Sequence, residues 1–123
     1  MRILVVDDSA IMRKVIEQIL DVLGHEAVQA GHGIEALERL SSESDIRLIL
    51  LDWNMPEMNG IEFLRTVKTD DRFQDIPVIM LTTESERRKM IEAIEAGARH
   101  YLTKPFQPET LATKILQCVG DAA

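Results

Sequence analysis

Three carboxylates, two hydroxyls and one amine follow short apolar runs in this 123-residue sequence. In chain order they are Asp7, Asp8, Asp52, Thr82, Thr83 and Lys104. Three carboxylates in one pocket repel one another, and this repulsion raises their pKa values. A hard divalent cation such as Mg²⁺ removes the conflict, because it prefers oxygen ligands and leaves room for a phosphate oxygen. One Mg²⁺ and Lys104 together would cancel the charge of the three carboxylates, so the pocket could accept a phosphoryl group.

The chemistry that these residue types favour is phosphoryl transfer to a carboxylate. One carboxylate would act as the nucleophile and form an acyl phosphate. The metal and Lys104 would share the charge that develops on the equatorial phosphoryl oxygens. A threonine hydroxyl could donate a hydrogen bond to the remaining oxygen.

Each of these residues also has a simpler interpretation when it is taken alone. Asp8 could cap a helix, Asp7 could be a solvated acid, and Asp52 could belong to a turn. The threonines could be ordinary strand-end residues, and Lys104 a solvated loop residue. A shared metal and phosphate site explains all of them together, whereas the simpler interpretations must hold independently at four strand ends.

The elements that position these residues alternate between strands and helices. Short apolar runs predict strands at Ile3–Val6, Glu26–Ala30, Leu48–Leu51, Val78–Leu81 and His100–Thr103. Helical spacing of apolar residues predicts helices over Ile11–Leu23, Ile34–Leu40, Ile61–Val67, Met90–Ile94 and Pro108–Val119.

Cap residues support these helix boundaries. Ser9 and the Asn59/Glu62 pair suit helix starts, while Gly24 and Gly97 suit helix ends. Five such units predict an α/β fold, in which a parallel sheet carries helices on both faces. In such sheets ligands gather at the carboxyl ends of the strands, where the candidate residues stand.

Composition narrows the function classes. The length fits one domain over residues 1–123, and 46% apolar residues are enough for a core without disulfides. A net charge of −7 argues against nucleic-acid binding. The N-terminal apolar run is too short for a signal peptide or a membrane span, and Cys118 is the single cysteine, so we expect a cytoplasmic protein without membrane contact.

Other polar groups have simpler interpretations. The three histidines, His25, His32 and His100, lack metal-ligand spacing and are expected at the surface. Cys118 is expected in the core. A basic run at residues 87–89 is expected on a solvated helix face, although an acidic peptide could dock there.

Four motifs together resemble the receiver domain of response regulators. They are Ile3-Leu4-Val5-Val6-Asp7-Asp8-Ser9, Leu50-Leu51-Asp52-Trp53-Asn54-Met55-Pro56 with Asn59-Gly60, Leu81-Thr82-Thr83, and Lys104-Pro105-Phe106. The resemblance covers essentially the whole chain and is strongest to the single-domain chemotaxis regulators of that family. It implies a flavodoxin-like, doubly wound sheet with strand order 2-1-3-4-5. It also implies a stand-alone phosphorelay protein that catalyses only its own phosphorylation and dephosphorylation.

The resemblance implies a role for each matching site residue. Asp52 would be the phosphoacceptor, and Asp8, Asp52 and the Asn54 carbonyl would bind Mg²⁺, with Asp7 assisting through water. Lys104 would hold the phosphoryl group, beside the hydroxyls of Thr82 and Thr83.

Further implied roles concern switching and lifetime. Thr82 would move toward the phosphoryl group while Tyr101 swings inward. Asn54 and Glu84 would tune self-hydrolysis, and the Lys104–Pro105 peptide bond would be cis.

The implied partners are proteins. A sensor histidine kinase or a phosphotransfer protein would supply the phosphoryl group. A downstream target would bind through the fourth helix, fifth strand and fifth helix of a chain that is expected to be monomeric.

Three departures from the family pattern modify these expectations. Gly31-His32-Gly33 replaces the usual acidic residue before a glycine, which predicts a looser second loop. Thr83 replaces a small apolar residue and is expected to crowd the phosphoryl entry. The fourth helix, from Glu86 to Glu95, matches that of the chemotaxis regulators poorly, which argues against a flagellar-motor partner. Chemotaxis is still the expected pathway, with another phosphorelay as the alternative.

Two other protein classes remain as alternatives. A phosphohydrolase of the haloacid-dehalogenase type needs a second aspartate two residues after its nucleophile, where this chain has Asn54. A flavin-binding domain needs a first loop rich in glycine and hydroxyls, where this chain has Asp7-Asp8-Ser9-Ala10. An absorbance scan for bound flavin separates the second alternative from a receiver domain.

Overall fold

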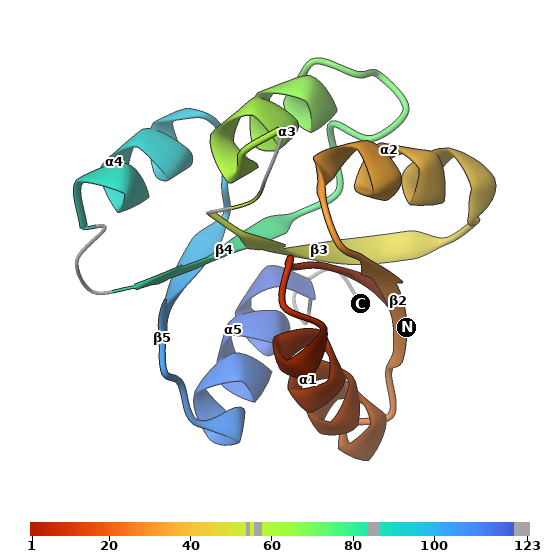
Figure 1. Ribbon diagram of the computed structural model, residues 1–123, viewed down its shortest axis with the longest axis vertical. Coiled ribbons are helices and arrows are strands. Elements are labelled where there is room, and N and C mark those ends of the chain that lie inside the picture. The colour runs from red at the N-terminus through yellow and green to blue at the C-terminus, as the bar shows by residue number, and fades with distance from the viewer. Residues whose placement is uncertain (54, 56–57, 84–86, 120–123) are drawn as a thin grey trace.

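The protein is an α/β sandwich whose single described sheet lies between two layers of helices (Figure 1). The computed structural model describes residues 1–53, 55, 58–83 and 87–119, with the side chains of Arg87 and Lys89 excepted. The strands are β1 (Arg2–Val6), β2 (Glu26–Ala30), β3 (Ile46–Asp52), β4 (Val78–Thr83) and β5 (His100–Lys104). The helices are α1 (Ala10–Val22), α2 (Gly33–Ser42), α3 (Gly60–Lys68), α4 (Arg87–Glu95) and α5 (Pro108–Val119).

The sheet has the predicted topology. Its strands are all parallel and lie in the order β2-β1-β3-β4-β5. Helices α1 and α5 cover one face, and α2, α3 and α4 cover the other (Figure 1). The fold class predicted from the alternating strands and helices is therefore confirmed.

Alternating side chains divide the core into two clusters, because successive residues of a strand point to opposite faces of the sheet. On β1, Ile3 and Val5 pack with the buried residues of α1 and α5, whereas Leu4 and Val6 pack with those of α2 and α3. Strand β3 divides in the same way. Both faces are apolar, which is why these strands read as continuous hydrophobic runs.

Local hydrogen bonds at the helix starts agree with the predicted caps. Ser9 Oγ accepts from the Met12 amide, and Asn59 Oδ1 accepts from the Glu62 amide. At the helix ends, Gly24 and Gly97 have positive φ angles of 85° and 113°, which favour glycine.

The loop before α2 differs from its prediction. His32 caps the helix, because its Nδ1 accepts from the Glu35 amide, and Glu35 Oε1 accepts in return from the Gly31 amide at 2.7 Å. These reciprocal bonds satisfy two backbone donors, as in a capping box. The expectation of a looser second loop was wrong, since a histidine nitrogen replaces the usual cap oxygen.

Helix α4 has a second apolar face besides the one that packs on the sheet. Met90 and Ala93 are buried, whereas Ile91 is 64% exposed and Ile94 is also exposed. The apolar spacing of Met90, Ile91 and Ile94 predicted the helix, but it did not separate the core contacts from the solvent-exposed residues.

Within the described part of the chain, no helix is long and apolar enough to cross a membrane.

Candidate functional site

Strand register brings the candidate residues to one edge of the sheet. Val6 on β1 pairs with Leu51 on β3, so Asp7 and Asp52 come next on adjacent strands. Thr83 on β4 pairs with Lys104 on β5. All four strands are parallel, and their carboxyl ends therefore meet at this edge.

Strand alternation also decides which side chains can meet. Asp52 follows Leu48 and Leu50 at two-residue spacing, and Lys104 likewise follows Leu102, so both lie on the face that α1 and α5 cover. Asp7 continues the same spacing from Val5. This alternation explains how an amine and two carboxylates from three strands come into contact.

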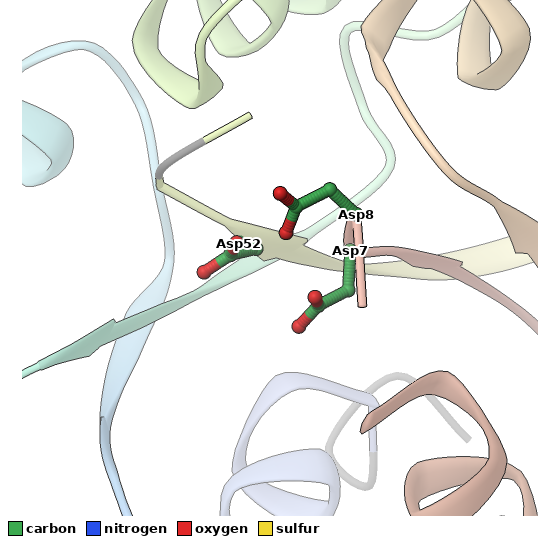
Figure 2. Close-up of side chains that lie close together, drawn as sticks. All are labelled: Asp7, Asp8 and Asp52. Carbon is green, nitrogen blue, oxygen red and sulfur yellow. The ribbon is translucent and has the colours of Figure 1, made fainter. Parts of the chain in front are cut away.

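Asp7, Asp8 and Asp52 form an acidic cluster (Figure 2). One carboxylate oxygen from each lies within 4.8 Å of the others. Asp7 is 1% exposed and Asp52 is 8% exposed, whereas Asp8 is exposed to solvent. The cluster therefore has two buried members and one member that solvent can reach.

Lys104 bridges the two buried carboxylates. Its Nζ donates to Asp52 Oδ1 at 2.9 Å and to Asp7 Oδ2 at 3.0 Å. Asp7 Oδ1 accepts from the Ser9 amide at 2.9 Å, so both oxygens of this carboxylate have a partner. The Lys104 side chain is 18% exposed, so it is mostly but not fully enclosed.

The environment changes the proton affinity of both members of the bridge. Burial raises the pKa of Asp52 to about 6, the hydrogen bond from Lys104 opposes this rise, and the charges of Asp7 and Asp8 add to it. Burial alone would lower the pKa of Lys104, but the hydrogen bond and charge of Asp52, together with Asp7, raise it above its ordinary value. The carboxylates thus have more negative charge than one lysine neutralises.

The donor set fits a magnesium ion. Mg²⁺ takes carboxylate and carbonyl oxygens and retains several waters, and the cluster offers carboxylate oxygens from the exposed Asp8 and the buried Asp52. A cation there would also offset the charges of Asp7 and Asp8, which add to the rise that burial causes in the pKa of Asp52. Asn54, the remaining expected ligand, lies outside the described residues.

Thr82 has a buried hydroxyl at the end of β4. The residue is 1% exposed, and no described residue offers a hydrogen-bond partner to its Oγ1. A buried polar atom without a partner is costly and is normally satisfied by a water, an ion or a ligand. The Thr82 hydroxyl is therefore available to an oxygen that enters the site.

The other predicted residues have distinct positions. Thr83 is exposed at the end of β4, and Tyr101 on β5 is exposed as well. The Lys104–Pro105 peptide bond is cis, as the resemblance implies. Glu84 lies outside the described residues, so its expected role in self-hydrolysis stays a prediction.

Two residues, Gly60 and Arg13, support the site in ways that were not predicted from the sequence. The Gly60 amide donates to the Trp53 carbonyl at 2.9 Å, and a Cβ at Gly60 would lie 2.7 Å from the Asp52 carbonyl oxygen. Only glycine permits this close approach of α3 to the end of β3. The Arg13 guanidinium donates to the Asp7 carbonyl. This contact between α1 and the β1–α1 loop is not predicted by any local sequence pattern.

Comparison with known proteins identifies the class. A family model described as response regulator receiver domain matches residues 3–116. The chain belongs to this family, whose members act in signalling and not as conventional enzymes. The family is neither of the two alternative classes, the phosphohydrolases and the flavin-binding domains.

Individual relatives are CheY proteins. The chain is similar to chemotaxis protein CheY1 of Helicobacter pylori, with 46% identity over 98% of both chains. It is 40% identical to chemotaxis protein CheY-3 of Vibrio cholerae, over 94% of this chain and 88% of that one. The resemblance to single-domain regulators is therefore confirmed.

Solved structures agree with this assignment. The chemotaxis protein CheY4 of Vibrio cholerae superposes with a TM-score of 0.88 at 36% identity, covering 95% of this chain and 97% of the other. A response regulator described as putative, from Chloroflexus aurantiacus, gives a TM-score of 0.92 at 28% identity, covering 97% of each chain.

Proposed function

We propose that this chain is a one-domain response regulator that accepts a phosphoryl group on Asp52 in a Mg²⁺-dependent reaction. The observation that carries the proposal is the Lys104 bridge between Asp7 and Asp52 inside the acidic cluster. The donor would be a phosphohistidine of a sensor kinase or a phosphotransfer protein. The names of the chemotaxis relatives favour chemotaxis as the pathway, and we propose the cytoplasm as the location.

Asp52 is the nucleophile in this proposal. One of its carboxylate oxygens attacks phosphorus, the bond between phosphorus and the donor breaks, and an acyl phosphate forms on the aspartate. A pKa of about 6 leaves the carboxylate mostly ionised at neutral pH and more basic than an exposed one.

Lys104 and Thr82 donate hydrogen bonds to the phosphoryl group once it is on Asp52. The Lys104 amine moves its hydrogen bond from Asp52 to a phosphoryl oxygen, while it retains Asp7. The Thr82 hydroxyl, unpaired among the described residues, donates to a second oxygen. Mg²⁺, bound by Asp8, Asp52 and the Asn54 carbonyl with Asp7 assisting, would neutralise charge on the phosphoryl oxygens. Thr83 stands exposed at the entry, where we propose that it slows transfer.

The downstream surface is formed by α4, β5 and α5. A groove of about 440 Å³ beside Tyr101 includes Ile94, Phe106 and Lys114, and another of about 420 Å³ lies between Tyr101 and the exposed Ile91. Movement of Thr82 toward the phosphoryl group would vacate space behind it, and inward rotation of Tyr101 would change both grooves. We propose that a target protein reads this change while the chain stays monomeric.

Trp53 offers a direct test of the metal and phosphoryl steps. It is the only tryptophan of the chain, and it is buried next to Asp52. We expect Mg²⁺ to change its fluorescence saturably, and acetyl phosphate to cause a second change that requires Mg²⁺.

Two variants separate the steps. Asp52→Asn is expected to abolish the second change, whereas Thr83→Ala is expected to accelerate it. A second change that persists in Asp52→Asn would contradict the assignment of the phosphoacceptor.

A further inference from the structure

The side chain of Arg13 connects α1 with two neighbouring segments. Its Nη1 donates to the backbone carbonyl of Asp7, and its Nε donates to Gln29 Oε1 on β2 at 3.2 Å. Gln29 Nε2 in turn donates to Glu17 Oε2 at 2.6 Å. The partly buried guanidinium is thus fixed to β2 through Gln29, which Glu17 on α1 holds in turn. At the same time it bonds the loop that carries Asp7 and Asp8.

The Asp7 carbonyl belongs to the peptide that links Asp7 to Asp8, and the other polar groups of Asp7 are already fixed. The Asp7 amide donates to the Ala30 carbonyl at 3.1 Å, and the two carboxylate oxygens accept from Ser9 and Lys104. The turn that the Ser9 amide closes with the Asp7 carboxylate spans the Asp7–Asp8 peptide, and the contact with Arg13 adds a direct constraint on the orientation of its carbonyl.

The position of the Asp8 carboxylate depends on the orientation of that peptide more than the position of the Asp7 carboxylate does. Its carboxylate is exposed, and it has no hydrogen bond to any residue that the structure describes. Burial and side-chain contacts hold Asp7 in place, whereas the backbone alone directs the Asp8 carboxylate toward Asp52.

We propose that Arg13 is a positioning residue for the metal site, which fixes the Asp7–Asp8 peptide so that the Asp8 carboxylate faces Asp52. The proposal rests on the proposed function, because it assigns Arg13 to the site that would bind Mg²⁺. Groups that orient metal ligands typically change metal affinity by about 10- to 100-fold when they are removed.

The geometry of the guanidinium matters here more than its charge. Arg13 forms no salt bridge among the described residues, and the two oxygens to which it donates, the Asp7 carbonyl and Gln29 Oε1, are neutral. Its rigid plane presents two donors to two acceptors at once, which the single nitrogen of a lysine cannot do in the same way. Arg13→Lys therefore keeps the charge and removes the clamp.

Gly31 lies next to the guanidinium, close enough that a Cβ there would make ordinary van der Waals contact with it. A Cβ at Gly31 would lie 3.4 Å from Arg13 Nη1 and 3.9 Å from Glu35 Oε1. The loop before α1 and the loop before α2 thus both lie next to Arg13. The bond from the Gly31 amide to Glu35, which caps α2, therefore lies beside the bond from Arg13 to the Asp7 carbonyl.

The first experiment measures Mg²⁺ affinity by titration calorimetry. We expect Arg13→Lys and Arg13→Met to weaken binding by about tenfold each, since loss of the clamp and not loss of charge is the cause. Gln29→Met, which removes one anchor without changing charge, is expected to weaken binding less. Lys14→Met removes a charge from the next, exposed position and is expected to leave affinity unchanged.

Ile16→Val is the control for general destabilisation. Ile16 is fully buried on α1, so this variant loosens the same helix without a contact to the acidic pair. It should lower the unfolding midpoint and leave Mg²⁺ affinity unchanged. Wild-type affinity in Arg13→Lys, or an equal loss in Ile16→Val, overturns the proposal.

A second readout needs no metal and separates this proposal from the proposed function. Backbone amide order parameters in the metal-free protein are expected to fall at Asp8 and Ser9 in Arg13→Lys, from the rigid range near 0.85 toward about 0.6. Unchanged order parameters overturn the clamp, whatever the metal data are. Lack of Mg²⁺ binding by the wild-type protein, with the expected loss of order in the variant, would instead contradict the proposed function.

Discussion

Replacement of Asp52 by asparagine should stabilise the metal-free protein at neutral pH. Asp52 is 8% exposed, and burial raises its pKa from an ordinary 3.8 to about 6. At 1.36 kcal/mol per pKa unit, the ionised carboxylate costs about 3 kcal/mol of folding free energy at pH 7.5. Asparagine has nearly the same shape and carries no charge, so most of this cost should disappear.

The sign of the pH dependence follows from proton uptake. Between pH 3.8 and about 6 the folded protein binds more protons at Asp52 than the unfolded chain does, so this residue lowers stability as pH rises through that window. The advantage of Asp52→Asn should therefore be largest above pH 7 and fall to about half at pH 5.

Urea unfolding in the presence of a chelator measures this advantage. Asp8→Asn is the matched control, because Asp8 is exposed and its removal relieves little burial of charge. Added Mg²⁺ should reverse the order, since it stabilises the wild-type fold by binding and has lost a ligand in Asp52→Asn. Equal midpoints for the wild type and Asp52→Asn at pH 7.5 without metal would refute the reasoning about Asp52.

Three further substitutions test separate parts of the site. Gly60→Ala should destabilise the fold by about 2 kcal/mol, because its Cβ would clash with the Asp52 carbonyl; an unchanged urea midpoint would contradict the close approach. Thr82→Val should stabilise the metal-free protein by about 1 kcal/mol, since it removes a buried hydroxyl without a partner among the described residues, and it should weaken the Trp53 response to phosphorylation. Lys104→Met should lower the free energy of unfolding at pH 7.5 by about 2 kcal/mol, because it leaves two buried carboxylates without their amine. It should also tighten Mg²⁺ binding measured by calorimetry, yet slow phosphorylation. Weaker Mg²⁺ binding would argue against the view that Lys104 and Mg²⁺ neutralise the same carboxylates.

The fold was predictable because its signals are local. Runs such as Ile3–Val6 are apolar on both faces of the sheet, and caps such as Ser9 depend on neighbours three residues away. Strand β3 begins at Ile46, because its backbone pairs with β1 from that residue on. The exposed Arg47 interrupts the apolar run and hides this start in the sequence. Hydrophobicity alone therefore placed its start two residues late.

The candidate site was predictable to the extent that it follows strand ends. Asp7, Asp52 and Lys104 meet because parallel register and two-residue alternation bring them to the same edge and face. The Thr82 hydroxyl has no partner among the described residues, and Arg13 clamps the loop after β1. Both features depend on packing between distant segments, which spacing does not encode. The His32 cap was missed for a related reason, since it also needs the side chain of Glu35 to turn back toward Gly31.

The most direct test of the central proposal is chemical location of the phosphoryl group. The protein is incubated with Mg²⁺ and acetyl phosphate, its intact mass is measured, and borohydride then reduces any acyl phosphate before peptide mapping. We predict a gain of one phosphoryl group that requires Mg²⁺, with the reduced residue at position 52 and no gain in Asp52→Asn. A phosphoryl group on another residue, or none on a folded protein that binds Mg²⁺, would contradict the assignment of Asp52 as the phosphoacceptor.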